Sequence, residues 1–167
     1  MGYDSFGLPA ENAAIKAKDL GLKVVIIEKA QVGGTCLNRG CIPTKALIQS
    51  AKIYSLTRKS KAFGIETSSP NIDFSAIQAR KENLVRQLRQ DMNFMLKGID
   101  FINDQAKILG PNTLDANGKS IQSKYILIAC GSKPMELANL KFDHQKIISS
   151  DDILNLKELP GSLLIIG

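Results

Sequence analysis

Apolar and polar positions predict a helix, a strand and a second helix in the first third of the chain. Residues 10–20 have helical composition and precede Gly21, a residue that commonly ends helices because it adopts positive φ at little cost. Residues 23–28 are apolar in the middle and predict a buried strand. This order predicts the second half of a βαβ unit, and a helical pattern resumes from Ala46 to Leu56.

A longer helix is predicted from Phe74 to Lys97. Its apolar residues recur at helical spacing, which predicts that they face the core; they are Ile77, Leu84, Leu88, Met92 and Met95. Basic residues mark the side that we expect to face solvent, namely Arg80, Lys81, Arg86 and Arg89. The preceding residues 61–74 are polar, so they predict a loop in which Asp73 or Ser75 caps the helix.

From Asp100 onward the hydrophobic period shortens to that of strands. Turn signals at Gly110-Pro111 and Asn117-Gly118 divide this segment and predict a β-meander that returns to the sheet. A further apolar run, YILIACGS at residues 125–132, predicts another strand. Together the elements predict an α/β fold with a parallel sheet and a β-meander.

The composition indicates an ordinary soluble globular chain with one core, because its 167 residues are 44% hydrophobic and 23% charged. The net charge of +6 comes from scattered lysines and arginines with few aromatic residues, which favours a solvated basic surface over a nucleic-acid site. No apolar stretch approaches the roughly 20 residues that span a bilayer, and no apolar leader follows Met1. With three cysteines, these features predict a protein of the reducing cytoplasm.

Cys36 and Cys41 are the chemically most informative residues, and they lie close together in the run GGTCLNRGCIPTK. A disulfide that closes so short a loop stabilises a fold only modestly, so reversible oxidation is the favoured interpretation. Gly40 permits unusual backbone angles, and Pro43 fits the first turn of a helix. We therefore expect Cys41 at a helix N-terminus, where unpaired amides and the macrodipole favour the thiolate and Lys45 adds positive charge.

Two other interpretations of the cysteine pair are a pair of buried apolar residues and half of a zinc site. A structural zinc site needs four ligands in paired short spacings, whereas Cys130 and His144 are isolated in the sequence, so zinc is disfavoured. Cys130 is predicted to be a small buried hydrophobe rather than a third redox centre. His144 is predicted to be a surface residue.

The run from Gly33 to Lys45 resembles the redox motif of the class I pyridine nucleotide-disulfide oxidoreductases, and within them most closely the dihydrolipoamide dehydrogenases. Besides the cysteines, the residues in register with that motif are Gly33, Gly34, Thr35, Asn38, Gly40, Ile42, Pro43 and Lys45. The resemblance implies a truncated, Rossmann-like FAD-binding domain with a redox-active disulfide over residues 1–148. It also implies a connector and the first strand of an absent NAD-binding domain over residues 149–167.

The resemblance further implies that the family's first strand, which belongs between Asp4 and Ser5, is missing. Ser5, Gly7 and Ala10 occupy the glycine positions of the GxGxxG loop. Glu28 follows Gly7 at about the 20-residue spacing at which an acidic residue meets the adenosine ribose. The implied FAD contacts are Gly7, Ala10, Glu28, Lys29, Gly33, Gly34, Thr35, Cys36, Lys45, Ala106, Cys130, Gly131 and Ser132.

The resemblance implies a disulfide oxidoreductase in which Cys36 exchanges with dihydrolipoamide and Cys41 passes electrons to FAD, which reduces NAD in the complete enzyme. The implied partner is a lipoyl-bearing protein of a 2-oxo acid dehydrogenase complex or of the glycine cleavage system. The family is homodimeric through an interface domain that lies outside the 167 residues, and neither a nucleic acid nor a membrane is implied as a partner. Two alternatives stay open: a degenerate, non-catalytic fragment that binds no flavin, and a segment of a glutathione or mercuric reductase.

Overall fold

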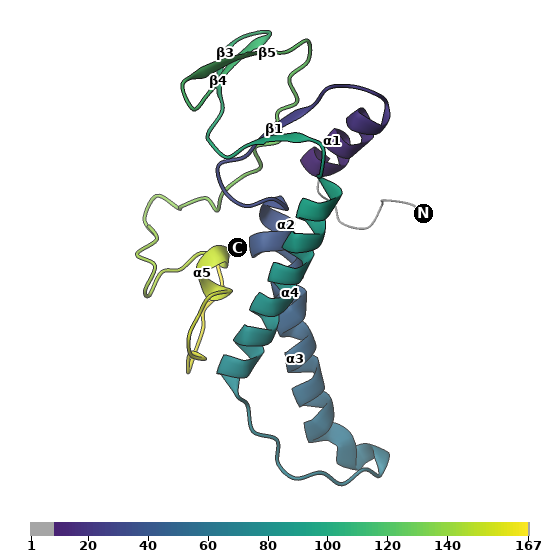
Figure 1. Cartoon of the computed structure of the whole chain (residues 1–167). Coiled ribbons are helices and arrows are strands. Elements are labelled where there is room, and N and C mark those ends of the chain that lie inside the picture. The colour runs from purple at the N-terminus through teal and green to yellow at the C-terminus, as the bar shows by residue number, and fades with distance from the viewer. Residues whose placement is uncertain (1–8, 167) are drawn as a thin grey trace. The chain divides into compact units, whose positions relative to one another are not determined.

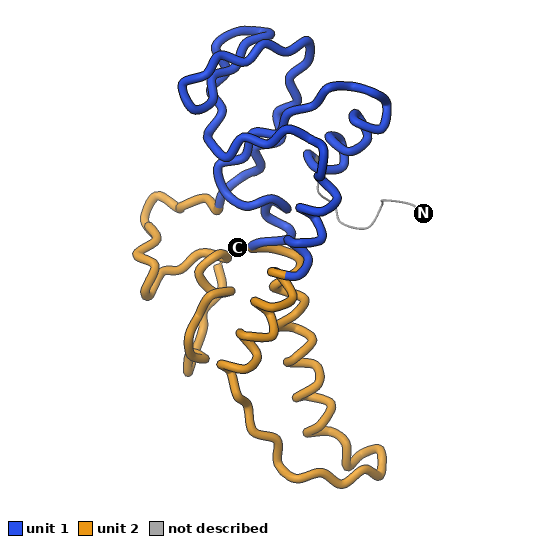
Figure 2. Tube along the Cα trace, in the orientation of Figure 1, with its two compact units in different colours: residues 1–38, 87–133 blue, residues 39–86, 134–167 orange. Residues whose placement is uncertain are grey.

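The helices and strands of a computed structural model of the chain fall into two compact units (Figure 1; Figure 2). The structure describes residues 9–166, so the predictions on Ser5 and Gly7 lie outside the described residues. Unit 1 is formed by residues 9–38 and 87–133, and unit 2 by residues 39–86 and 134–166. In chain order the elements are α1 (Pro9–Asp19), β1 (Val25–Ile27), α2 (Gly34–Arg39), α3 (Cys41–Lys59), the 3-10 helix η1 (Ser60–Phe63), α4 (Phe74–Met95), β2 (Asp100–Ile102), β3 (Lys107–Gly110), β4 (Thr113–Ala116), β5 (Lys119–Gln122) and α5 (Ser150–Ile153).

Unit 1 contains a two-stranded parallel sheet whose register places Ile26 of β1 opposite Phe101 of β2. The backbone N–H of Glu28 extends the pairing by donating to the Ile102 carbonyl at 3.0 Å. Among the described residues β2 is the one strand that pairs with β1. The predicted absence of the family's first strand concerns positions outside the described residues and stays a prediction. The prediction that this strand is buried is wrong, because a strand with one neighbour stays half-exposed.

The predicted β-meander is confirmed as a three-stranded antiparallel sheet, β3–β4–β5. Asn117 and Gly118 both have positive φ, 56° and 67°, as a tight hairpin between β4 and β5 requires. The meander does not return to the β1–β2 sheet as predicted but forms a sheet of its own. The strand predicted at residues 125–132 is also wrong, since this run forms no ladder and exposes Tyr125, Leu127 and Ile128.

Helix α4 begins one residue after Asp73, whose Oδ1 accepts the Ala76 backbone N–H at 2.9 Å and so confirms the predicted cap. The predicted core face of this helix is wrong in part. Leu84 is 38% exposed, whereas Lys81, expected on the solvent side, is only 3% exposed. The buried side chains of α4 and the residue just beyond it are Lys81, Val85, Met92 and Leu96. The helix ends at Met95 rather than Lys97, and Arg89, also expected in solvent, is half-buried.

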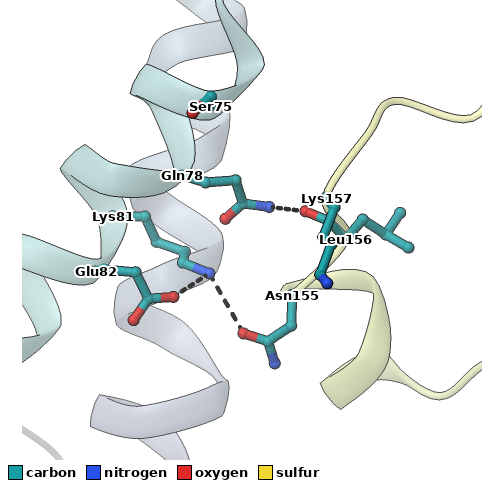
Figure 3. A pocket seen from close by; sticks show the side chains of 7 residues that line it. All are labelled: Ser75, Gln78, Lys81, Glu82, Asn155, Leu156 and Lys157. Atoms are coloured by element: carbon teal, nitrogen blue, oxygen red, sulfur yellow. Dashed lines mark hydrogen bonds and ion pairs between the residues drawn. The ribbon is translucent and has the colours of Figure 1, made fainter.

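Buried Lys81 lies in unit 2, where it attaches the segment after α5 to helix α4 (Figure 3). Its Nζ donates to the Leu154 carbonyl at 2.6 Å and forms an ion pair with Glu82 at 2.8 Å. One turn away, Gln78 Nε2 donates to the Leu156 carbonyl at 2.8 Å. The hollow between these residues has a volume of about 280 Å³ and is lined by Ser75, Gln78, Lys81, Glu82, Asn155, Leu156 and Lys157.

Helix α5 begins with a capping box in which Ser149 and Asp152 bond reciprocally. The backbone N–H and the hydroxyl of Ser149 donate to Asp152, and these bonds together with His144 lower the pKa of Asp152 from 3.8 to about 2. The His144 ring lies 2.9 Å from the same carboxylate but is otherwise exposed, which confirms it as a surface residue. Backbone N–H groups of Gln145, Ile147 and Lys146 similarly hold the pKa of Asp143 below its usual value.

Candidate functional site

Cys36 lies in unit 1 on the six-residue helix α2, which is anchored by its neighbour Leu37. Leu37 is 2% exposed, and its backbone N–H donates to the Gly33 carbonyl at 3.2 Å. Gly33 has φ +97°, and a Cβ atom at this position would lie 2.2 Å from Leu37 Cδ2. The glycine therefore permits both the turn into α2 and the packing of the leucine over it.

The side-chain amide of Asn38, two residues after Cys36, is bonded at both ends. Its Nδ2 donates to the carbonyls of Val32 and Gly34, both at 2.9 Å. Its Oδ1 accepts from Nε and Nη2 of Arg89 on α4, at 3.0 and 2.7 Å. These bonds connect the turn before α2, the end of α2 and the long helix α4 within unit 1.

A buried carboxylate contacts the same turn from helix α1. Glu11 is 8% exposed, and its Oε1 accepts the backbone N–H of Gly33 at 2.7 Å. Because the acceptor is a carboxylate, this is the stronger, charge-assisted kind of hydrogen bond. The turn that precedes the helix of Cys36 is thus held from α1 through Glu11 and from α4 through Asn38.

Cys41 lies in unit 2 as the first residue of helix α3, which confirms its predicted place at a helix N-terminus. Gly40 precedes the helix with φ −139° and ψ −112°, and the capping position supplies no side-chain acceptor to the helix amides. Pro43 is fully buried in the first turn, and both Cys41 and Lys45 are exposed. The Cys41 side chain therefore lies at the end of α3 where the first backbone N–H groups have no partner within the helix.

Comparison with known proteins identifies the family. A family model described as pyridine nucleotide-disulphide oxidoreductase matches residues 7–167. The chain belongs to this family. A dihydrolipoyl dehydrogenase of Bacillus subtilis is 38% identical over 93% of this chain and 36% of its own length. The Geobacillus stearothermophilus dihydrolipoyl dehydrogenase is 42% identical over 93% of this chain and 34% of its length. The chain therefore spans about a third of these relatives.

Two solved structures share the fold of this chain. The HOCl-induced flavoprotein disulfide reductase RclA of Escherichia coli matches with a TM-score of 0.75 and 29% identity, over 93% of this chain and 34% of that one. LpdA of Mycobacterium tuberculosis matches with a TM-score of 0.76 over 92% of this chain and 36% of that one. At 22% identity, the second likeness supports the fold alone.

The three cysteines of the chain differ in their exposure to solvent. Cys36 is half-buried and Cys41 is exposed. Cys130, predicted to be buried, is exposed in the segment that forms no strand, so that prediction is wrong. The redox pairing of Cys36 with Cys41 stays a prediction from the motif.

The residues predicted to contact FAD differ in their burial and in the unit to which they belong. In unit 1, Ala10 is half-buried on α1, Gly33 is buried with its amide bonded to Glu11, and Gly34 and Thr35 are exposed at the start of α2. Lys29 and Ala106 are exposed, as are Cys130, Gly131 and Ser132. Lys45 belongs to unit 2, and Gly7 lies outside the described residues.

Glu28, predicted to meet the adenosine ribose of FAD, lies at the end of β1. It is half-buried directly after β1, at the carboxyl end of the strand, where Rossmann folds place the acidic residue for ribose. Its Oε1 accepts the Ala30 backbone N–H at 2.8 Å, and Asn103 Nδ2 donates to the Glu28 carbonyl at 2.8 Å. These bonds fix the strand end, so this carboxylate is presented in a defined position.

The prediction from sequence missed the residues that hold the turn before α2. Asn38 was recognised as part of the motif, but Glu11 and Arg89 were assigned no role. One signal was available for Arg89, because it follows Val85 by four residues and precedes Met92 by three, the spacing of one helix face. None of the described helices is long and apolar enough to cross a membrane.

Proposed function

We propose that this chain is the thiol-bearing, FAD-binding segment of a disulfide reductase of the dihydrolipoyl dehydrogenase type. The observation that carries the proposal is the complete run from Gly33 to Lys45, with Cys36 on α2 and Cys41 at the start of α3. Relatives named dihydrolipoyl dehydrogenase, at 38% and 42% identity, support this substrate class over that of glutathione or mercuric reductases. Because the chain spans about a third of those relatives, the activity is proposed for the complete protein.

The two cysteines would alternate between a disulfide and two thiols. We assign the exchange with dihydrolipoamide to Cys36, whose sulfur forms a mixed disulfide with one substrate sulfur as the Cys36–Cys41 bond breaks. The second substrate thiol then displaces Cys36, so lipoamide leaves with its ring disulfide formed and both cysteines are reduced. Two electrons and two protons have moved from substrate to protein.

Cys41, the first residue of α3, is assigned to pass these electrons on, as the family resemblance implies. FAD, when bound, would supply the two-electron acceptor from which NAD is reduced in the complete enzyme. In this chain Glu28 would hold the ribose of the flavin nucleotide, while Gly34 and Thr35 offer exposed backbone at the turn before Cys36. The backbone N–H of Gly33 already donates to Glu11. We therefore expect Gly33 to contribute to the site because it has no side chain, and not through a hydrogen bond from its amide.

The partner we propose is a lipoyl-bearing protein of a 2-oxo acid dehydrogenase complex or of the glycine cleavage system, as the family resemblance implies. We also propose that residues 149–167 lead from the FAD-binding domain toward an NAD-binding domain, with the capping box at Ser149 marking the start of that connector. The cytoplasm is the proposed compartment, because thiols that cycle need a reducing environment in which no permanent disulfide forms.

Proteolysis of the oxidised protein tests the redox pair. Arg39 lies between the two cysteines, so trypsin separates them unless a disulfide keeps the fragments together. After treatment with oxidised glutathione, we expect linked fragments from the wild type and from Cys130→Ser, and separate fragments from Cys41→Ser. Separate fragments from the wild type at every ratio of oxidised to reduced glutathione would overturn the proposed thiol chemistry.

Flavin binding is tested separately with the purified chain, FAD, and the visible spectrum of the protein fraction after removal of unbound flavin. We expect bound FAD in the wild type and weaker binding in Glu28→Gln, with the exposed Glu158→Gln as the matched control. The competing function is a degenerate fragment that binds no flavin. It is favoured because β1 pairs with one strand among residues 9–166, and a protein fraction without flavin would decide for it.

A further inference from the structure

Asn38 uses its side-chain amide to full capacity in the part of unit 1 that carries Cys36. Three carbonyl oxygens accept from its Nδ2: Val32 and Gly34 at 2.9 Å, and Gln31 at 3.4 Å. Two donors of Arg89 converge on its Oδ1. An amide group offers two donors and one doubly accepting oxygen, so little capacity is left for water or for a ligand.

The helix that carries Cys36 depends on such contacts because it has only six residues. Isolated helices of this length do not persist in water, since nucleation costs more than a single turn returns. The position of the Cys36 sulfur is therefore set by what holds α2: the buried side chain of Leu37, the bond from Gly33 to Glu11, and the amide of Asn38.

We propose that Arg89 is a positioning residue for Cys36, because it fixes the side-chain amide of Asn38 that ties the turn before α2 to the end of that helix. The inference rests on the proposed function, in which Cys36 is the thiol that exchanges with substrate. In this role Arg89 acts through Asn38, whose Oδ1 accepts both of its hydrogen bonds.

The arginine enforces one orientation of the amide. With Oδ1 toward the guanidinium, Nδ2 faces the carbonyls of Val32 and Gly34. A flipped amide would bring its oxygen against those carbonyl oxygens and its NH₂ group against a cation, so both ends would be repelled. Both nitrogens that Arg89 uses belong to one rigid planar group, a geometry that lysine cannot reproduce.

Holding α2 in place should raise the effective concentration of the Cys36 thiol in disulfide formation. The partner in the proposed disulfide lies five residues along the chain. A Cys36 thiol on an ordered α2 loses less conformational entropy when that bond forms than one on a fraying turn. Loss of the Arg89 contact should therefore shift the dithiol–disulfide equilibrium toward the dithiol. The shift should appear even when the protein stays folded.

The test is a redox titration of the 167-residue chain against mixtures of reduced and oxidised glutathione, with the linked tryptic fragments as readout. Each oxidation of the two thiols to a disulfide consumes one oxidised glutathione and yields two reduced molecules. We expect the equilibrium constant to fall about tenfold in Arg89→Gln, which is about 30 mV for a two-electron couple. Arg89→Lys should recover only part of this loss, since it keeps the charge but not the two donors of one planar group.

Arg86→Gln is the matched control, because this exposed arginine lies on the same helix and donates to Asn83 within its own turn. Urea unfolding of each variant identifies conditions in which all are folded. An Arg89→Gln equilibrium within twofold of the wild type overturns the inference, and so does an equal shift in Arg86→Gln, which would mean that only charge on α4 matters.

A second measurement separates this inference from the proposed function. In NMR spectra the side-chain amide of Asn38 should have the shifts of a bonded group in the wild type and those of a solvated asparagine in Arg89→Gln. If no Cys36–Cys41 disulfide forms in the wild type, the proposed redox function fails. Solvated shifts for Asn38 in the wild type overturn the positioning role of Arg89 whatever the thiols do.

Discussion

Replacing Lys81 by methionine tests whether the buried ammonium group holds the segment after α5. Methionine keeps an unbranched apolar side chain in the space that the lysine stem fills, and removes the donor to the Leu154 carbonyl at 2.6 Å. Hydrogen bonds from charged groups contribute about 1.5–3 kcal/mol, and Leu154 is only 7% exposed, so water does not easily replace the donor. The ion pair adds little because Glu82 is 58% exposed.

We therefore expect Lys81→Met to lower the free energy of unfolding by about 2 kcal/mol. For a chain of this size that corresponds to a fall in Tm of about 4–8 °C. Urea unfolding followed by circular dichroism measures the change. Two controls isolate the cause: Glu82→Gln removes the ion pair alone, and Lys52→Met makes the same substitution at an exposed position of α3. Both should stay within about 1 kcal/mol of the wild type.

A local readout accompanies the global one. Trypsin cleaves after Lys157, which lies just beyond the attached segment, so the loss of the Lys81 bond should accelerate cleavage at that site. A Lys81→Met variant as stable as Lys52→Met, with unchanged cleavage at Lys157, would refute the reasoning. It would mean that the fold tolerates the buried lysine but gains nothing from its ammonium group.

Two further substitutions test other parts of the structure. Gly33→Ala should destabilise the chain by about 2–4 kcal/mol, because the new Cβ sits at positive φ and overlaps Leu37. Gly34→Ala also has positive φ but meets open space, so it should cost about 1–2 kcal/mol. Equal urea midpoints for the two variants would contradict this. The second is Asp152→Asn. The pKa of Asp152 is lowered from 3.8 to about 2 in the folded chain, so its stabilisation is present above pH 4 and is lost as pH falls toward 2. Asp152→Asn should flatten the fall in the urea midpoint across that window, and an unchanged fall would contradict this assignment.

Elements that depend on neighbouring residues were predicted well. Gly21 ends α1 with φ +80°, Pro43 lies in the first turn of α3, and Asn117-Gly118 forms the hairpin turn. In each case the deciding physics is local: a residue that adopts positive φ, a ring that fits a helix start, or a missing N–H. The position of Cys41 at a helix N-terminus was predicted for the same reason.

Contacts between distant residues were not predictable from the pattern. Lys81 was placed in solvent because a lysine among apolar residues usually marks the exposed face, but its acceptor lies 73 residues further along the chain. Arg89 was misjudged likewise, since Asn38 lies 51 residues away. The apolar run at 125–132 reads as a strand in isolation, yet pairing needs a neighbouring strand that it does not have among the described residues.

Among the described residues β1 pairs with one strand, so we expect the backbone amides on its two edges to exchange with solvent deuterium at different rates. Glu28 donates to β2 and Val24 accepts from it, so by the alternation of a strand Ile26 faces β2 as well. Val25 and Ile27 point their backbone groups the other way, where the described residues supply no strand. Amide exchange should therefore alternate residue by residue, slow at Ile26 and fast on either side of it, within one three-residue strand.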